Sequence, residues 1–355
     1  MQPPTSLSPD VVKLIAEIDE FKGRWDAFQA LTPHRLNALR RIATIESVGS
    51  STRIEGAKLT DAQVETLLAN LKHTRFETRD EQEVAGYAEA MDFVFEAYAD
   101  LGLTENHILQ LHNILLRHSN KDERHRGDYK KLPNNVVAFD ADGQEIGIVF
   151  ETTTPFATPR EMADLVAWAR KAIDEDAFHP LLIVGIFIVR LLAIHPFQDG
   201  NGRLSRILTN LLLLRAGYGY VPYASLESVI EENKEFYYQA LRRTQTSFKD
   251  DTPDWDPWIG FFLRCLKKQK DNLVQRLDRE KSEPPDDDEL PELSLKILSL
   301  FQERPRLTIA QITEFTGANR NTLKLRLRSL VEAGRLVRRG KARATWYALS
   351  ENGRP

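Results

Sequence analysis

The amino-acid sequence predicts a mainly α-helical protein, in which a large helical part with one β-hairpin is followed by a small α+β domain. Three observations support this fold class: helical spacing of apolar residues in most segments, strand-like alternation in one segment, and a change of charge near residue 290. With 355 residues, 42% hydrophobic and 28% charged, the chain has the composition of an ordinary globular protein. It is long enough for two or three domains.

The first helical part contains segments in which apolar residues recur three or four positions apart, as on the buried face of a helix. In chain order they are Val11–Phe28, Leu36–Ile45, Ala62–Leu71, Gln82–Ala99, Glu105–Leu116, Arg160–Ile173, Pro180–Ile194, Leu204–Leu214, Ser228–Arg243 and Trp255–Leu277.

Residues 134–150 depart from this helical pattern. Apolar residues lie on either side of the turn-forming sequence Asp140–Gly143, which favours two antiparallel strands joined by a tight loop. The apolar residues are Val136, Val137 and Phe139 before the turn, and Ile146, Ile148 and Phe150 after it. We therefore expect a β-hairpin here.

The charge divides the chain at an acidic, proline-containing run over 283–289. From Pro291 to Pro355 there are 13 Lys and Arg residues against 5 Asp and Glu, whereas the preceding part has 35 against 47. Prolines beside like charges favour an extended, solvated linker. We expect an N-terminal helical region over 1–100, a core over 101–280, a linker over 281–291 and a basic domain over 292–355.

The segment His195–Arg206 is a polar sequence that begins between two apolar helices. Gly200 and Gly202 lack side chains that would keep a ligand from the backbone, and the following helix N-terminus offers free N–H groups. Arg203 and Arg206 lie three residues apart, so both guanidinium groups can reach one polyphosphate. This pattern predicts an anion site.

Two further side chains in the same segment fit phosphate transfer. Asp199 supplies a hard oxygen ligand for Mg²⁺, and His195 is able to accept a proton near pH 7. A site of this kind positions a nucleotide, neutralises its charge and activates an incoming hydroxyl.

The same residues match every fixed position of the signature H-x-F-x-[DE]-G-N-G-R-x-x-R, and the chain resembles the Fic family through it. The resemblance implies a helical Fic domain that transfers AMP from ATP to a protein Ser, Thr or Tyr hydroxyl. It implies His195 as general base, Asp199 as Mg²⁺ ligand and Phe197 as an apolar anchor of the loop. ATP binding is implied for Gly200, Asn201, Gly202, Arg203, Leu204, Ser205 and Arg206.

Two other segments resemble parts of the family. The hairpin over 134–150 occupies the place of the flap, which pairs with an extended segment of the protein substrate. The helical segment over 232–241 resembles the helix beside the adenine pocket, where we expect Tyr238 to contact ATP, with core packing of this tyrosine as the alternative. Arg126, Gly127 and Tyr129 resemble a further stretch that closes the fold beneath the flap.

The segment Ser50–Gly56 resembles the inhibitory motif [ST]-x-x-x-E-[GN] of the family, with Ser51, Glu55 and Gly56 on the fixed positions. We expect a helix over about 47–57. The resemblance implies that Glu55 pairs with Arg206 and competes with an ATP phosphate for its guanidinium group. The alternative is an ordinary helix cap followed by a solvated acid.

The basic C-terminal part resembles a winged helix-turn-helix domain. Helical spacing in Leu293–Phe301, Thr308–Phe315 and Asn319–Leu330 precedes two strand-like pieces, Leu336–Arg338 and Thr345–Leu349. The third helix and the wing carry cations suited to DNA phosphates; the alternative is a protein-binding or dimerising module. The cations are Arg320, Lys324, Arg326 and Arg328, then Arg335, Arg338, Arg339, Lys341 and Arg343.

Several alternatives to AMP transfer are compatible with the sequence. Another Fic chemistry, such as removal of AMP or transfer of phosphate or phosphocholine, would use the same loop. A DNA-binding regulator with a nucleotide-sensing, inactive Fic domain is the non-enzymatic alternative, and a homodimer is left open. His107, His112 and His118 are five and six residues apart, which does not place them on one helix face, so we expect surface or packing roles rather than a metal site.

The cysteine content and the apolar runs bear on the compartment. The single cysteine, Cys265, allows neither an internal disulfide nor a multi-thiolate zinc site, so we expect a reducing, cytoplasmic location. The longest apolar run, Leu181–Ile194, is interrupted by Arg190 and is shorter than the roughly 20 residues of a membrane span. We expect no membrane association.

Overall fold

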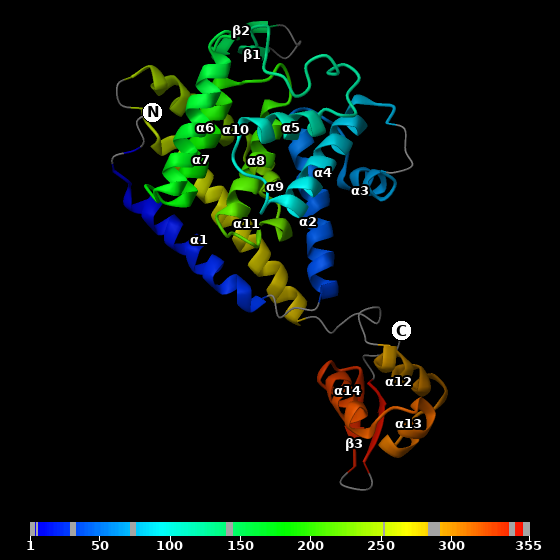
Figure 1. Ribbon diagram of the computed structural model, residues 1–355. Helices are drawn as coiled ribbons and strands as arrows, with labels where there is room; N and C mark the ends of the chain where they lie inside the picture. Colours follow the sequence, from blue (N-terminus) through cyan, green and yellow to red (C-terminus); the bar gives the residue numbers. More distant parts are fainter. Residues whose placement is uncertain are drawn as a thin grey trace. The chain divides into compact units, whose positions relative to one another are not determined.

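The computed structural model describes residues 4, 6–28, 33–71, 76–139, 145–250, 253–282, 292–340 and 345–350. It divides into two compact units, Met1–Leu273 and Val274–Pro355. Both are mainly helical, and each has one two-stranded antiparallel sheet in its described residues, which confirms the predicted fold class (Figure 1).

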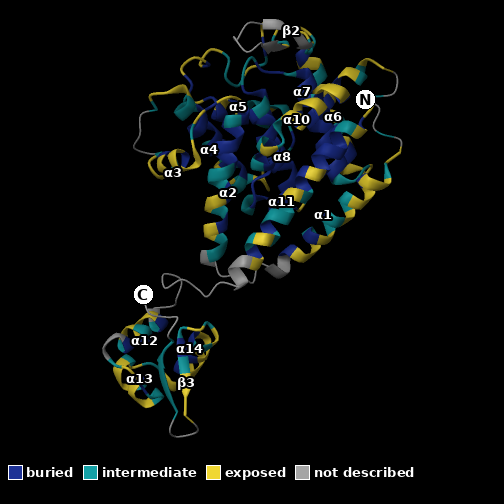
Figure 2. Cartoon of the chain, turned by 180° about the vertical axis from the view of Figure 1, so that it is seen from behind, coloured by how far each residue is buried: buried dark blue, intermediate teal, exposed yellow. Residues whose placement is uncertain are grey.

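The first unit is a bundle of helices around two central apolar ones, α7 and α8 (Figures 1 and 2). In chain order its helices are α1 (Pro9–Phe28), α2 (Pro33–Ile54), α3 (Asp61–Ala69), α4 (Arg79–Ala97), α5 (Glu105–Leu115), α6 (Thr158–Asp174), α7 (Pro180–Ile194), α8 (Asn201–Arg215), α9 (Leu226–Glu232), α10 (Lys234–Thr246) and the part of α11 (Asp256–Ser282) up to Leu273, with short 3₁₀ turns at Val221–Tyr223 and Ser247–Lys249.

Helix α7 forms the centre of the core because its sequence is apolar on every side. Its residues are buried from Leu181 to Val189 and again from Leu191 to Ile194. At Gly185 the neighbouring helix α11 approaches so closely that a Cβ would touch Ile259, and Trp258 donates a hydrogen bond of 2.7 Å to the Gly185 carbonyl. This packing fixes the N-terminal half of α7 against α11.

Helix α2 and the segment over 228–243 differ from the sequence expectation. Helix α2 continues past Ile45 to Ile54, so the separate helix expected over about 47–57 is the end of α2, followed by a turn at Gly56. The helix continues through Gly49 despite the low helical propensity of glycine, because its neighbours Ser47, Val48 and Ser50 are buried against the rest of the unit. The segment expected as one helix over 228–243 is two, α9 and α10, separated at Asn233.

The hairpin of the first unit consists of β1 (Val136–Phe139) and β2 (Glu145–Phe150). The strands pair antiparallel, with Val136 opposite Phe150, and the register shifts at two places. The turn residues 140–144 lie outside the described part of the chain. Helix α10 contacts β2, so the hairpin stands beside the helix that carries Tyr238.

The second unit contains α12 (Glu292–Glu303), α13 (Ile309–Thr316), α14 (Arg320–Glu332), β3 (Leu336–Arg339) and β4 (Trp346–Leu349). Gly317 adopts a left-handed conformation after α13, as the predicted break between two helices requires. A small core joins all three helices to the hairpin through Ile297, Phe301, Leu307, Ile312, Leu323, Leu327, Leu330 and Leu336.

Some expectations fall on residues that the structure does not describe. The acidic run 283–289 and the wing cations Lys341 and Arg343 lie outside the described residues, whereas 281–282 belong to the end of α11. Among the described residues, none of the helices combines the length and apolar character needed to cross a membrane.

Candidate active site

The signature segment begins at the C-terminus of α7, where His195 adopts a left-handed conformation with φ of 53°. The side chain of Asn201 closes the loop, because its amide oxygen accepts from the Phe197 N–H at 2.9 Å and its amide nitrogen donates to the Phe197 carbonyl at 2.7 Å. Gly200 is left-handed, and helix α8 begins directly after it, three residues earlier than expected. The first N–H groups of α8 therefore follow the loop as an anion-binding terminus.

His195 is held as a neutral base. Its Nδ1 lies 3.3 Å from the Leu192 carbonyl, which can only accept, so Nδ1 carries the hydrogen and Nε2 keeps a lone pair. Burial lowers the pKa of His195 to about 4, so the imidazole is uncharged at pH 7. An uncharged imidazole with a lone pair on Nε2 can accept the proton of a hydroxyl.

Asp199 is an ionised carboxylate at the other end of the loop. Its Oδ1 accepts hydrogen bonds from the Gly200 N–H and from Arg203 Nη2, the latter at 3.1 Å. Burial favours the neutral acid, but Arg203 and the Gly200 N–H outweigh it and lower the pKa of Asp199. This residue therefore offers negative charge to a cation at neutral pH.

Ser51 and Glu55 meet Arg206 at the C-terminal end of α2. Arg206 is buried, and its Nε donates to Ser51 Oγ at 2.8 Å. Its Nη2 donates to the Ser51 carbonyl at 3.0 Å and to Glu55 Oε1 at 2.7 Å. Burial alone would favour neutral Glu55, yet Arg206 holds the pKa of Glu55 below its usual value, so the pair is ionised.

Glu55 also lies against Gly202 of the signature. A Cβ added at Gly202 would collide with the carboxylate of Glu55. Gly56 follows with φ of 106°, so the chain turns away immediately after the carboxylate has been presented. The Glu55 carboxylate thus lies where α8 presents its free backbone N–H groups.

A cavity of about 660 Å³ connects these residues with the hairpin and α10. Its lining includes His195, the residues from Gln198 to Gly202 and Glu55, together with Asn134, Val136, Phe150 and Tyr238. Tyr238 is 44% exposed, whereas its neighbour Tyr237 is buried. Both tyrosines line the cavity, Tyr238 with a partly exposed side chain and Tyr237 with a buried one.

His112, to which the sequence assigned only a packing role, supports the signature loop. Its ring stacks on Phe197 with centroids 3.8 Å apart, and both side chains are fully buried. Nδ1 accepts from the Gly127 N–H at 2.9 Å, so Nε2 carries the hydrogen and donates to the Asp199 carbonyl at 3.0 Å. Burial lowers the pKa of His112 to about 4. The irregular spacing of the histidines gave no sign of this contact.

Lys130 and Asn134 tie the base of the hairpin to the signature. Lys130 is buried, and Nζ donates to Ile194 O at 2.9 Å, Thr152 Oγ1 at 3.0 Å and Asn134 Oδ1 at 2.7 Å. Asn134 Nδ2 in turn donates to the carbonyl of His195 at 3.0 Å. Burial lowers the pKa of Lys130 to about 8. The resemblance of Arg126, Gly127 and Tyr129 pointed to this region but not to these contacts.

The donor set fits a nucleotide with Mg²⁺. Arg203 Nε and Arg206 Nη1 are buried without a hydrogen-bond partner among the described residues, as donors awaiting an anion would be. In the described part of the chain no three acidic, histidine or cysteine side chains gather around a metal position. One carboxylate is enough for Mg²⁺ when phosphates complete its shell, so Asp199 fits that ion.

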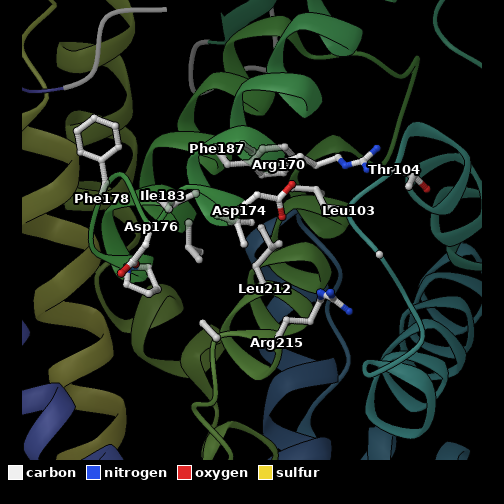
Figure 3. Close-up of a pocket in the computed structure, with 16 residues that line it drawn as sticks. Leu103, Thr104, Arg170, Asp174, Asp176, Phe178, Ile183, Phe187, Leu212 and Arg215 are labelled. Atoms are coloured by element: carbon white, nitrogen blue, oxygen red, sulfur yellow. The ribbon is translucent and has the colours of Figure 1, made fainter.

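A second cavity, of about 320 Å³, lies among α6, α7, α8 and the segment before α5 (Figure 3). Ile183, Phe187 and Leu212 form an apolar wall, while Arg170 and Arg215 carry charge at its side. None of the residues that line it belongs to the signature. It is therefore separate from the site built by His195 and Glu55.

Two segments of the chain match models of known families. Residues 102–213 match the model of the Fic/DOC family. The chain carries a Fic/DOC domain. Residues 290–337 match the model of winged helix-turn-helix DNA-binding domains. The family resemblance seen in the signature and in the C-terminal helices is thereby confirmed at the level of domains.

Curated proteins that match this chain are distant relatives. A protein adenylyltransferase Fic from Drosophila mojavensis is 28% identical over 274 residues, which make up 74% of this chain and 48% of the relative. That of Drosophila melanogaster is 27% identical over 273 residues, 74% of this chain and 49% of the relative. The chain spans about half the length of the curated relatives it matches.

Solved structures share the fold. A Fic family protein from Desulfovibrio desulfuricans G20 matches the whole of both chains with a TM-score of 0.69 and 26% identity. Fic-1 from C. elegans matches with a TM-score of 0.59 at 20% identity, over 76% of this chain and 73% of that one, which supports the fold alone.

Proposed function

We propose that this chain is a protein adenylyltransferase that moves AMP from ATP to a Ser, Thr or Tyr hydroxyl of a target protein. The observation that carries the proposal is the neutral His195, with Nε2 free, at one edge of a cavity whose floor is an anion-binding helix terminus. The name of the Drosophila relatives, protein adenylyltransferase, supports the same chemistry.

The reaction follows from the groups around the cavity. The target hydroxyl oxygen attacks the α-phosphorus of ATP, its proton passes to His195 Nε2, and pyrophosphate leaves as the α-phosphorus–oxygen bond breaks. Gly200, Asn201, Gly202, Leu204 and Ser205 form the terminus that holds the phosphates, and Arg203 and Arg206 supply guanidinium donors. Mg²⁺, when bound by Asp199, would neutralise phosphate charge.

The neighbouring elements have separate roles in the proposal. The hairpin over 134–150 holds an extended segment of the target by strand pairing, and Tyr238 contacts the adenine side of ATP. Glu55 restrains the enzyme, since its carboxylate takes the Arg206 donor and lies over Gly202, where a phosphate would bind. Removal of this carboxylate would free both positions.

Intact-mass analysis after incubation with ATP and Mg²⁺ tests the activity and the restraint together. The Glu55→Gly protein is expected to gain the mass of AMP, whereas wild type and the Glu55→Gly, His195→Ala double variant stay unmodified. The double variant separates base catalysis from the loosening of α2. Absence of AMP on Glu55→Gly and on added target proteins, despite ATP binding, would contradict the transferase and favour another Fic chemistry.

A second function is favoured for the C-terminal domain. We propose that it binds DNA, because its match is to winged helix-turn-helix DNA-binding domains and residues 291–355 carry 13 basic against 5 acidic side chains. On α14, Arg320, Lys324 and Arg328 are exposed at four-residue spacing, while Leu323 and Leu327 pack in the core. This face is suited to a DNA backbone.

A further inference from the structure

Asp199 belongs to a closed ring of four charged side chains. Arg79 Nε lies 2.7 Å from Glu83 Oε1, and Glu83 Oε2 lies 3.3 Å from Arg203 Nη1. Arg203 Nη2 lies 3.1 Å from Asp199 Oδ1, and Asp199 Oδ2 lies 3.2 Å from Arg79 Nη2. Both carboxylate oxygens of Asp199 are therefore held by guanidinium groups.

The two arginines of this ring differ in freedom. The Arg203 side chain is 2% exposed and is fixed on the first turn of α8. The Arg79 side chain is 56% exposed, so breaking its ion pair with Asp199 costs little free energy. The backbone at Arg79 is itself well fixed, because Thr78 and Glu81 form a capping box at the start of α4. Only the outer part of the Arg79 side chain needs to move.

We propose that Arg79 is an electrostatic latch, which covers Asp199 Oδ2 until a divalent cation replaces its guanidinium group. The inference rests on the proposed role of Asp199 as the magnesium ligand. Arg79 and the cation compete for one oxygen, so removal of Arg79 raises cation affinity. Glu83 holds the guanidinium of Arg79 in reach of Asp199 and balances the charge of Arg203.

Titration of the nucleotide-free protein with Mn²⁺, followed by the EPR signal of the free ion, tests the latch. We expect Arg79→Ala to tighten Mn²⁺ binding about two- to fivefold, the scale of one partly exposed ion pair. The Mn²⁺ affinity of Arg79→Lys should lie between those of wild type and Arg79→Ala. Arg117→Ala is the matched control, since Arg117 is 54% exposed and pairs with Glu89 outside the ring. Asp199→Asn should abolish the Arg79→Ala effect.

The outcomes separate the latch from the transferase. Unchanged or weaker Mn²⁺ binding in Arg79→Ala would overturn the latch, and a loss of ATP binding instead would assign Arg79 to the phosphates. Tighter Mn²⁺ binding in Arg79→Ala that disappears with Asp199→Asn would support the latch, even if Glu55→Gly transfers no AMP. Mn²⁺ binding is measured without nucleotide, so it does not depend on the reaction.

Discussion

At the scale of single residues, the site depends on side chains whose partners fix their hydrogen positions. His112 accepts from Gly127 and donates to Asp199, so a second proton on its ring would break the Gly127 hydrogen bond. The sequence identified His195, Asp199 and Arg206 because they stand in one contiguous signature. It missed His112, because the contact of His112 with Asp199 joins residues 87 positions apart.

The buried, neutral His112 makes stability depend on pH. Its pKa is about 4 in the folded chain, below the usual value of 6.5, so the unfolded chain binds the proton more tightly and stability is lost as the pH falls below 6.5. At pH 5 this costs roughly 2 kcal/mol relative to neutral pH. Urea unfolding at both pH values should show a smaller difference in His112→Asn than in wild type.

The control for that comparison is His107→Asn, on the same helix, where Nδ1 lies 2.8 Å from the Gly102 carbonyl. The explanation would be refuted if His112→Asn and wild type lost equal stability between pH 7 and pH 5.

At the scale of elements, the end of α2 is positioned by more than Glu55. Arg53 bonds Glu231 of α9 through Nε at 2.7 Å and Nη2 at 3.0 Å, and Nη1 bonds Asp61 at 2.9 Å. A helix over part of this segment could be expected from the sequence. Its continuity from Pro33 to Ile54 could not, because the residues around Gly49 gain their helical preference from packing rather than from propensity.

Arg53→Ala should therefore weaken the restraint without removing Glu55. We expect AMP transfer above wild type but below Glu55→Gly, because Glu55 still reaches Arg206 from a looser helix end. Self-modification rates by mass spectrometry would measure this order. Arg41→Ala serves as control, since Arg41 lies on the same helix in an exposed pair with Glu65. Equal rates for Arg53→Ala and wild type would show that the Glu231 contact has no part in the restraint.

The hairpin is a second element whose position the sequence left open. Alternation predicted the strands, but their attachment to the signature runs through the buried amine of Lys130. Lys130→Met, in the Glu55→Gly protein, should lower transfer to a protein target about tenfold by misplacing the flap, with ATP binding retained. Lys131→Met is the neighbouring control, because Lys131 is exposed and pairs with Asp128. An equal loss of transfer in Lys130→Met and Lys131→Met would count against a specific role of Lys130.

At the scale of the whole molecule, the division of charge along the sequence alone separates two kinds of domain. Helical spacing predicts the fold class, and the contiguous signature predicts the Fic/DOC domain. Both can be recognised from the sequence because they depend on residues that are neighbours along the chain. The contacts between distant segments, such as the ring that includes Arg79 and Asp199, depend on how helices pack. The proposals on the restraint by Glu55 and on metal binding at Asp199 are based on such contacts.

The basic domain yields the last prediction. If α14 neutralises DNA phosphates, binding of the full chain to duplex DNA should weaken linearly with log salt, by about 0.9 per phosphate contact. The double variant Arg320→Ala, Lys324→Ala should bind DNA more weakly. Its slope should be smaller by about 1.8, the value for two phosphate contacts. Fluorescence anisotropy over a salt series measures both the affinity and the slope.

The control is Lys296→Ala, because Lys296 is an exposed cation on α12. If the α14 variants left the slope unchanged, these side chains would make no phosphate contacts. The basic face would then be assigned to a protein partner instead of DNA.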